Sequence, residues 1–97
     1  MSPYLLSPAA QLDLEQIWDC TCRRWDVDQA NGYLRELQRA IELVAVNPKI
    51  GQSCEEIRHC YRKLAAGSHI PYFRVMPEGV VDVVRVLHQR IDVDRRL

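Results

Sequence analysis

Apolar residues recur along the first half of the chain with the spacing of two helices. The buried face expected for the first helix consists of Ala10, Leu14, Ile17, Thr21 and Trp25. A short apolar strand over residues 4–6 precedes it, and Ser7 and Pro8 supply a capping hydroxyl and a suitable first helical residue. We expect this helix to end near Arg24, because residues 25–28 contain the next capping candidates.

A second helix follows after a short link. Its expected buried face consists of Ala30, Tyr33, Leu34, Leu37, Ile41 and Val44. Asn47 and Pro48 end it, because the residue before a proline avoids the α region. Two helices joined in this way form an antiparallel hairpin, and their apolar faces need a partner to cover them. The strands predicted for the second half of the chain are that partner.

The pattern changes to strands after residue 48. Residues 48–56 indicate a connecting loop, residues 57–64 a strand, and residues 70–75 the next strand. The run 80–87 contains five valines and one leucine, and it is the segment with the strongest strand preference. Because this run is almost continuously apolar, it should be covered on both faces and lie in the interior of the sheet.

Glycine and proline mark the turns between these strands. We expect turns at residues 66–67 and 76–79, each containing a glycine. Pro71 lacks a backbone N–H, so we expect a bulge or an unpaired position there. The resulting order is strand, helix, helix, strand, strand, strand. It predicts a single α+β domain over residues 1–97, with both helices on one face of an antiparallel sheet.

Charge and length limit the class of protein further. A chain of 97 residues makes one domain, which buries roughly 64% of the surface exposed by its unfolded form. Its 13 basic and 13 acidic residues balance. Residues 1–57 nevertheless carry a net charge of −4 and residues 58–97 a net charge of +4. No stretch reaches the length of a membrane span, and the N-terminus lacks a secretion signal. We therefore expect a cytoplasmic protein.

Four cysteines raise the question of a disulfide or a metal site. Cys20 and Cys22 would lie about 200° apart around a helix, so they cannot chelate one ion together. Cys54 and Cys60 flank the start of a strand, with His59 beside them. The chain contains no C-x-x-C pair, which structural zinc sites usually have. We expect four isolated thiols, with no metal and no cofactor.

Charged residues within the expected helices and strands also need explanation. Asp13 and Glu15 fall near the start of the first helix, where the helix dipole favours carboxylates. Arg85 falls inside the central strand, and a buried charge must be paired. Two partners for Arg85 remain open: Asp82 on the same strand, or an acidic residue on a helix.

One group of polar residues suggests chemistry. If Glu55 or Glu56 met Arg62 and His88 at one end of the sheet, a carboxylate, a guanidinium and an imidazole would be available together. Such groups suit the acid–base cleavage of a phosphodiester. The residues by themselves support no more than a small α+β domain with a basic sheet edge.

A series of short segments in order along the chain carries a family resemblance. They are Tyr4–Ala10, Asp13–Leu14, Ile17, Trp25, Gln29–Ala30, Tyr33–Leu34, Asn47–Pro48, Gly51, Arg58, Tyr61–Lys63, Gly67–His69, Tyr72–Val75 and Val83–Asp92. Taken together, they resemble the ParE-type toxins of the RelE/ParE superfamily over essentially the whole chain. The departures are Asp26 and Cys60, where the family pattern leads us to expect glycine, and neither position bears on function.

The resemblance implies a toxin of a type II toxin–antitoxin pair that poisons DNA gyrase, blocks replication and is not itself an enzyme. It also implies a ParD-like antitoxin whose C-terminal segment wraps the helical hairpin and the sheet. The gyrase contact is expected in the tail over residues 88–97, through His88, Gln89, Arg90, Asp92, Arg95 and Arg96. The antitoxin is expected to contact Leu14, Trp18, Tyr33, Leu37, Tyr72 and Arg74. No sequence-specific contact with nucleic acid is implied.

The alternative within the superfamily is a RelE-like, ribosome-dependent messenger RNA endonuclease. In that interpretation Glu56, Arg62 and His88 would be the catalytic groups. The charge balance argues against it, because affinity for nucleic acid comes largely from neutralised phosphates. A domain with an isoelectric point near 6.8 is a poor ligand for the ribosome.

Overall fold

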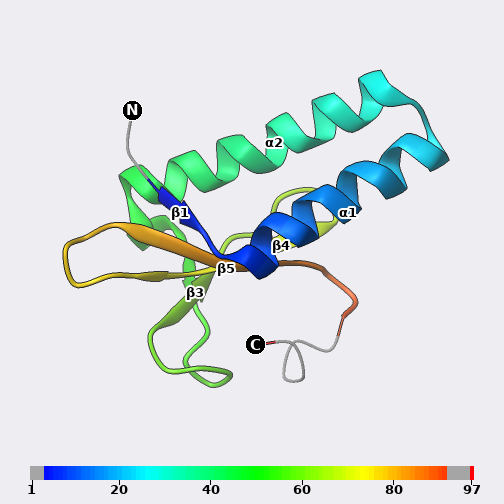
Figure 1. Ribbon diagram of the computed structural model, residues 1–97. Coiled ribbons are helices and arrows are strands. Elements are labelled where there is room, and N and C mark those ends of the chain that lie inside the picture. Colours follow the sequence, from blue (N-terminus) through cyan, green and yellow to red (C-terminus); the bar gives the residue numbers. More distant parts are fainter. Residues whose placement is uncertain (1–3, 92–96) are drawn as a thin grey trace.

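Two helices cover one face of a five-stranded sheet in the computed structural model, which describes residues 4–91 and 97 (Figure 1). The elements in chain order are β1 (Tyr4–Leu6), α1 (Pro8–Arg24), α2 (Val27–Val46), β2 (Gln52–Ser53), β3 (Tyr61–Lys63), β4 (His69–Val75) and β5 (Val81–His88). A single 3-10 turn, Pro48–Ile50, joins α2 to β2. The predicted α+β class and element order are confirmed, with β2 as an additional short strand.

The two helices begin where the sequence places capping residues. The Ser7 side chain accepts a hydrogen bond from the backbone N–H of Ala10, and the Asp26 carboxylate caps α2 in the same way. α1 ends at Arg24, as predicted. Trp25 was expected on the buried face, but it is 66% exposed because the chain leaves the helix there and turns into α2.

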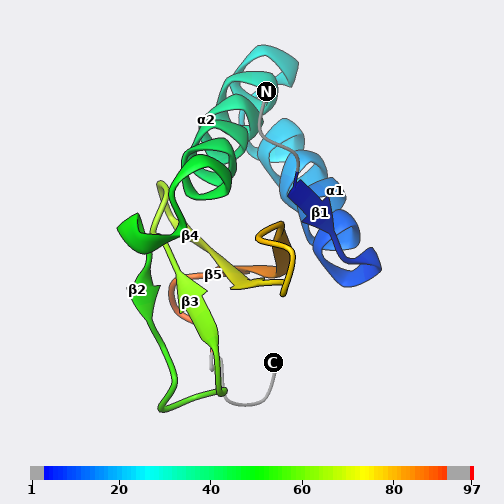
Figure 2. The same ribbon diagram turned by 90° about the vertical axis from the view of Figure 1, so that its left-hand side faces the viewer.

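The sheet is mixed rather than purely antiparallel. Its strand order is β1-β5-β4-β3-β2, so β5 lies in the interior, as its apolar run predicts. β1 pairs in parallel with β5, whereas the other neighbouring strands pair antiparallel. A parallel pair needs a long connection, and the helical hairpin forms part of it. Figure 2 shows both helices on the same side of the strands.

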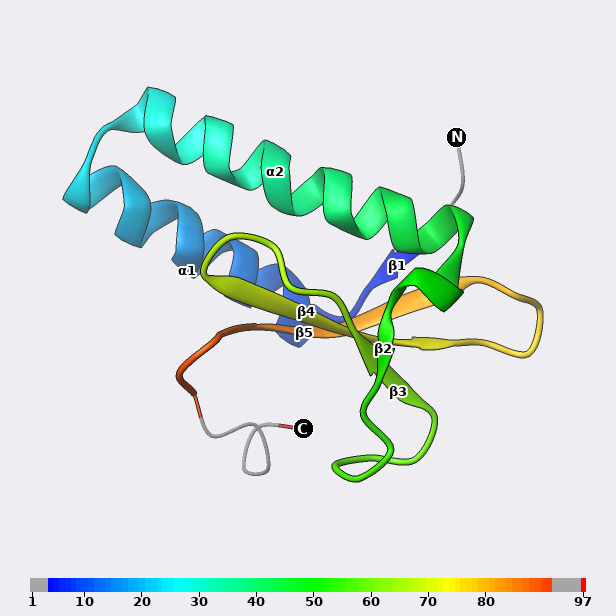
Figure 3. The same cartoon turned by 180° about the vertical axis from the view of Figure 1, so that it is seen from behind.

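The strand predicted over residues 57–64 is wrong in its first half. Only Tyr61–Lys63 is extended, and the residues before it form a turn in which the Cys54 carbonyl accepts hydrogen bonds from Ile57 and Arg58. Cys60 has a φ of +66°, a left-handed conformation that interrupts a strand. Seen from behind, this turn projects away from the helices (Figure 3).

The core has a large and a small part, one on each face of the sheet. The large part lies under the helices and contains Ala10, Ile17, Leu37, Ile41, Val44, Phe73, Val81, Val83 and Val86. The small part contains Cys54, Tyr72 and Leu87, with Leu97 packed against it. Neighbouring residues of a strand point to opposite faces of the sheet, so Tyr72 belongs to the small part of the core and Phe73 to the large part.

A bulge interrupts the pairing of β4 with β5. Tyr72 is opposite Arg85, but the next residue, Phe73, is opposite Val83, so β5 contains one extra residue. The bulge begins one residue after Pro71, where the sequence predicted an irregularity. Among the described residues, no helix has the length and apolarity needed to cross a membrane.

Two glycines provide a matched test of this packing. A Cβ at Gly51 would lie 2.5 Å from the Phe73 ring and 3.2 Å from the Lys63 carbonyl oxygen. Gly51→Ala should therefore lower the free energy of unfolding by about 1–3 kcal/mol, as overpacking does. A Cβ at Gly32 in α2 would meet nothing within 4 Å, so Gly32→Ala should raise it by about 0.5–1 kcal/mol. Urea denaturation measures the free energy of unfolding of both variants. If the two substitutions changed it by the same amount, this packing would be contradicted.

Candidate functional site

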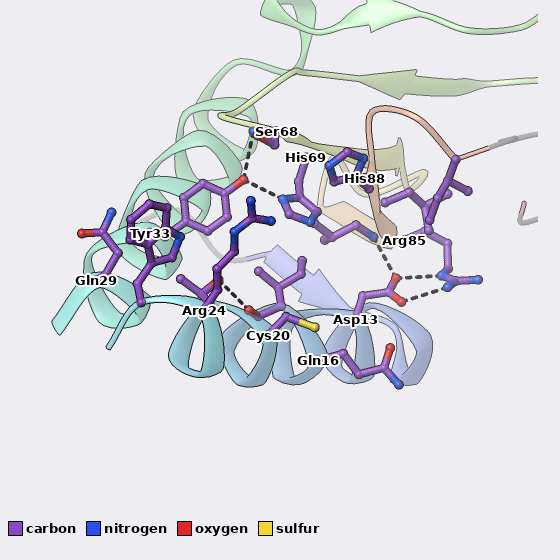
Figure 4. Close-up of a pocket in the computed structure, with 16 residues that line it drawn as sticks. Asp13, Gln16, Cys20, Arg24, Gln29, Tyr33, Ser68, His69, Arg85 and His88 are labelled. Carbon is purple, nitrogen blue, oxygen red and sulfur yellow. Dashed lines mark hydrogen bonds and ion pairs between the residues drawn. The ribbon is translucent and has the colours of Figure 1, made fainter. Parts of the chain in front are cut away.

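A pocket of about 720 Å³ opens where α1, the start of α2 and the ends of β4 and β5 meet (Figure 4). The helices supply one wall and the strand ends supply the other. Its polar lining includes Asp13, Arg24, Tyr33, His69, Arg85 and His88. The pocket thus lies at the point where the C-terminal tail leaves the sheet.

A short chain of hydrogen bonds joins α2 to the start of β4. The Tyr33 hydroxyl accepts from the Ser68 backbone N–H at 3.0 Å and lies 2.6 Å from His69 Nδ1. The His69 and His88 rings stand edge to face with centroids 5.2 Å apart. Gly67, with φ +59°, makes the turn, and a Cβ there would lie 2.6 Å from the Tyr33 ring. A glycine is therefore required for Tyr33 to reach His69.

A bidentate ion pair forms the opposite end of the pocket. Arg85 donates to both carboxylate oxygens of Asp13, at 2.7 and 2.8 Å, and the Val86 backbone N–H donates to the same carboxylate at 3.0 Å. The hydrogen bond to Asp13 raises the pKa of Arg85 above its ordinary value. Of the two partners left open for Arg85, the helical one is found, while Asp82 pairs with Arg74 at 3.1 Å.

Asp13 was expected near the start of the first helix, where the helix dipole favours a carboxylate, but the first turn of α1 contains no acidic residue. The Asp13 carboxylate lies one turn further along α1 and is 8% exposed. The missed signal was its spacing, because Asp13 follows Ala10 by three residues and precedes Ile17 by four, which places it on the buried face.

Burial and nearby charges shift the pKa values of two residues in the pocket. Burial lowers the pKa of His69, and the electrostatic interaction with His88 lowers it further, although Asp13 opposes both effects. Burial raises the pKa of Tyr33. The lowered pKa favours the neutral imidazole of His69, whose Nδ1 is hydrogen-bonded to the Tyr33 hydroxyl, and the Asp13 carboxylate is already engaged by Arg85 and Val86.

The predicted convergence of Glu56, Arg62 and His88 is wrong. Through β4, Arg62 is aligned with Val83, five residues before His88 on β5, which corresponds to about 17 Å along the strand. Glu56 lies in the exposed turn before β3, outside the paired strands. The Arg62 guanidinium instead donates to backbone carbonyls within residues 48–51. Strand register, which the sequence does not reveal, separates Arg62 from His88.

The residues expected to contact gyrase fall into two sets. His88 lines the pocket, and Gln89 and Arg90 follow it at the exposed start of the tail. The remaining candidates lie outside the described residues: Asp92, Arg95 and Arg96. At the end of the chain, Leu97 packs against the small core, and its carbonyl accepts hydrogen bonds from the Arg58 guanidinium.

The residues expected to contact the antitoxin are only partly at the surface. Leu37 is 0% exposed and Tyr72 is 4% exposed, so both side chains hold the two core parts and do not face a partner. Their apolar character predicted an interface, but it serves the interior. The other candidates have accessible surface: Leu14, Trp18, Tyr33 and Arg74.

Comparison with known proteins assigns the family. Residues 4–93 match the family model described as the ParE toxin of the type II toxin–antitoxin system parDE. The chain belongs to this ParE toxin family. It is 68% identical over 96 residues to Toxin ParE1 of Mycobacterium tuberculosis, covering 99% of this chain and 98% of that relative. The resemblance found in the sequence is thereby confirmed at the level of the family.

A second curated relative and one solved structure extend the comparison. The chain is 46% identical over 98 residues to Toxin ParE1 of Caulobacter vibrioides, covering all of this chain and 99% of that ParE protein. It is also similar to a solved structure titled "Chromosomal ParDE TA system from P. aeruginosa", with a TM-score of 0.78 and 16% identity over 91% of this chain and 96% of that one. At this identity the likeness concerns the ParE fold alone.

The lowered pKa of His69 predicts how stability depends on pH. Between the folded pKa and the ordinary value of 6.5, the unfolded chain binds more protons than the native one, so stability rises as pH increases through this window. We expect the melting temperature to fall on acidification below about pH 6.5, and to fall less in His69→Gln. His59→Gln is the control, because that side chain is 88% exposed. An unchanged pH profile in His69→Gln would contradict the assignment.

Proposed function

We propose that the protein is a cytoplasmic toxin that binds and poisons DNA gyrase, and that a ParD-like antitoxin neutralises it. The observation that supports this most is the 68% identity to Toxin ParE1 over 99% of the chain. The family assignment makes the chain a toxin of a type II pair. Gyrase as the target follows from the resemblance to ParE-type toxins, and no cofactor is needed for such binding.

The tail from His88 onward is proposed to carry the gyrase contact. Gln89 and Arg90 are exposed immediately after β5 and lie beside the pocket. The described start of the tail is held by the sheet, since Gln89 donates through its backbone N–H to the Ser68 carbonyl. Leu97 is held by the small core and by Arg58. Anchored ends reduce the conformational entropy lost on binding.

The geometry argues against the ribonuclease alternative. Two of the groups that would cleave RNA, Arg62 and His88, are far apart on the sheet, and the Arg62 guanidinium is occupied by backbone carbonyls. The acidic carboxylate in the pocket, Asp13, is paired with Arg85. Binding a protein target requires none of these groups to transfer a proton.

The helical hairpin offers an apolar surface for the antitoxin. Large exposed apolar side chains lie on α1, on α2 and in the link between them: Leu12, Trp25, Val27, Leu43 and Val46. Trp18 is half-buried on α1 and donates from its indole N–H to Asn31 on α2. The two edges of the sheet, β1 and β2, are open to strand addition. Helix docking and strand addition are both common ways of binding a peptide.

The gyrase proposal predicts a separation of two activities. Deletion of residues 92–97 should abolish the inhibition of gyrase supercoiling while antitoxin binding persists. Arg90→Glu should weaken that inhibition about tenfold or more, equivalent to about 1.4 kcal/mol, because an exposed attractive charge becomes repulsive. Supercoiling and DNA-cleavage assays with purified gyrase measure the first activity, and an antitoxin titration measures the second.

Two further variants control for folding and for catalysis. Leu97→Ala removes the side-chain contact with the small core and keeps the carbonyl that Arg58 holds, so it should lower the melting temperature slightly and leave gyrase inhibition intact. If Leu97→Ala abolished inhibition as fully as the deletion, the tail would act through folding. Glu56→Ala should be neutral, whereas a loss of about 10²–10⁴ in a ribosome-dependent RNA cleavage assay would support the nuclease instead.

The antitoxin proposal predicts an apolar interface. Trp18→Ala should weaken antitoxin binding by at least about 2 kcal/mol, or roughly 30-fold, as expected for an interfacial tryptophan. Val75→Ala is the matched control, because Val75 is an exposed apolar residue on β4, away from the hairpin. Affinity should change little with salt, and a steep decrease in affinity at high salt would indicate a mainly electrostatic contact.

A further inference from the structure

Three metal-ligating side chains meet in the turn before β3, outside the pocket. They are Glu55, His59 and Cys60, and within the described part of the chain their carboxylate oxygen, imidazole nitrogen and thiol sulfur all lie within 4.8 Å of one another. All three side chains are exposed. The turn projects from the side of the sheet opposite the helices (Figure 3), so the cluster is separate from the helical hairpin.

The spacing of these atoms suits a tetrahedral ion. Zinc binds histidine nitrogen and carboxylate oxygen at about 2.0–2.2 Å, so two such ligands in a tetrahedral site are about 3.4 Å apart. Glu55 Oε1 and His59 Nδ1 are 3.4 Å apart. A zinc-bound sulfur would lie about 3.6 Å from the nitrogen, and the Cys60 sulfur lies within 4.8 Å of the other two ligand atoms.

The kind of ligand also selects the kind of ion. A thiolate and an imidazole favour zinc and similar thiophilic cations, whereas calcium and magnesium prefer oxygen ligands. Three protein ligands leave a fourth position to solvent or to a further ligand, which is the arrangement of an open zinc site. A surface ion pair between Glu55 and His59 alone would leave the position of Cys60 unexplained.

Cys60 occupies a position where a glycine would be less strained. Its φ of +66° is the only positive value at a non-glycine residue among those described, and it costs roughly 1–2 kcal/mol for an L-residue. The turn is nevertheless well fixed, because the buried Cys54 accepts two of its backbone hydrogen bonds. The chain therefore keeps a thiol next to His59 in an unfavourable backbone conformation.

We propose that Glu55, His59 and Cys60 form a binding site for Zn²⁺ or a similar thiophilic divalent cation. On binding, the Cys60 thiol releases its proton to solvent and its sulfur donates an electron pair to the metal, without any change of oxidation state. Arg58 lies within the same turn and holds the Leu97 carbonyl, so the bound ion stiffens the turn that anchors the end of the chain. The site does not depend on gyrase being the target.

Cobalt titration of the tag-free, full-length protein tests the site. One Co²⁺ per chain should produce a thiolate-to-metal absorption band and visible bands of a four-coordinate ion, and Zn²⁺ should displace it. Cys60→Ser and His59→Gln should each weaken metal binding by at least about 100-fold. Loss of a residue that only supports a ligand costs up to about 100-fold, and loss of a ligand itself should cost at least as much. Cys20→Ser is the control, since that thiol is exposed and lies on α1 away from the cluster.

Cys60→Gly separates metal binding from folding. Glycine tolerates the positive φ, so this variant should fold with a similar melting temperature and show no thiolate band. Zn²⁺ should raise the melting temperature of the wild type and not that of Cys60→Gly. The proposal is overturned if the wild type gives no thiolate band, if Cys60→Gly retains it, if Cys20→Ser removes it, or if two chains share one ion.

Discussion

The carboxylate of Asp13 completes the hydrogen bonding of β5 where its neighbouring strand ends. β1 pairs with β5 only as far as Val83, so among residues 4–91 no strand lies beside the outer edge beyond it. Two side chains take the place of a strand there: the Ser7 hydroxyl donates to the Val84 carbonyl, and the Asp13 carboxylate accepts from the Val86 N–H. Asp13 also binds Arg85. A buried carboxylate without these partners would be costly, and so would the Val86 N–H without its acceptor. The angle at which α1 crosses the sheet is therefore determined by polar contacts as well as by the apolar core.

This arrangement divides the segment from Arg85 to Arg90 between two roles. Arg85 and Val86 fasten β5 to α1, and Leu87 packs into the small core on the other face. From His88 to Ile91 the chain pairs with no strand residue beyond His69 and becomes exposed. This segment, which is part of the resemblance to ParE-type toxins, thus combines residues that hold the sheet with residues that are exposed to a partner. For this reason, substitutions within one block are expected to affect either stability or binding, according to position.

The sequence predicted those features that arise from nearby residues. Helix boundaries followed from Ser7 and Asp26, because capping is a contact between residues three apart. The sequence left two candidate partners for Arg85 and could not choose between them, because the actual partner, Asp13, is 72 residues away in the chain. The proposed nuclease site failed for a related reason: Arg62 and His88 lie on the same sheet, but strand register places them far apart. Residues that line the pocket were noted one by one in the sequence, but only the fold shows that they lie close together in space.

The turn before β3 shows the opposite limit of sequence reasoning. Its three ligating residues lie within six positions of one another, yet the spacing matched no familiar zinc motif, and strand preference placed Cys60 in an extended segment. In a strand, His59 and Cys60 would point to opposite faces and could not share an ion. The left-handed conformation of Cys60 changes that direction. Because the same turn carries Arg58, which holds the Leu97 carbonyl, a single backbone conformation connects the ligand cluster to the end of the tail.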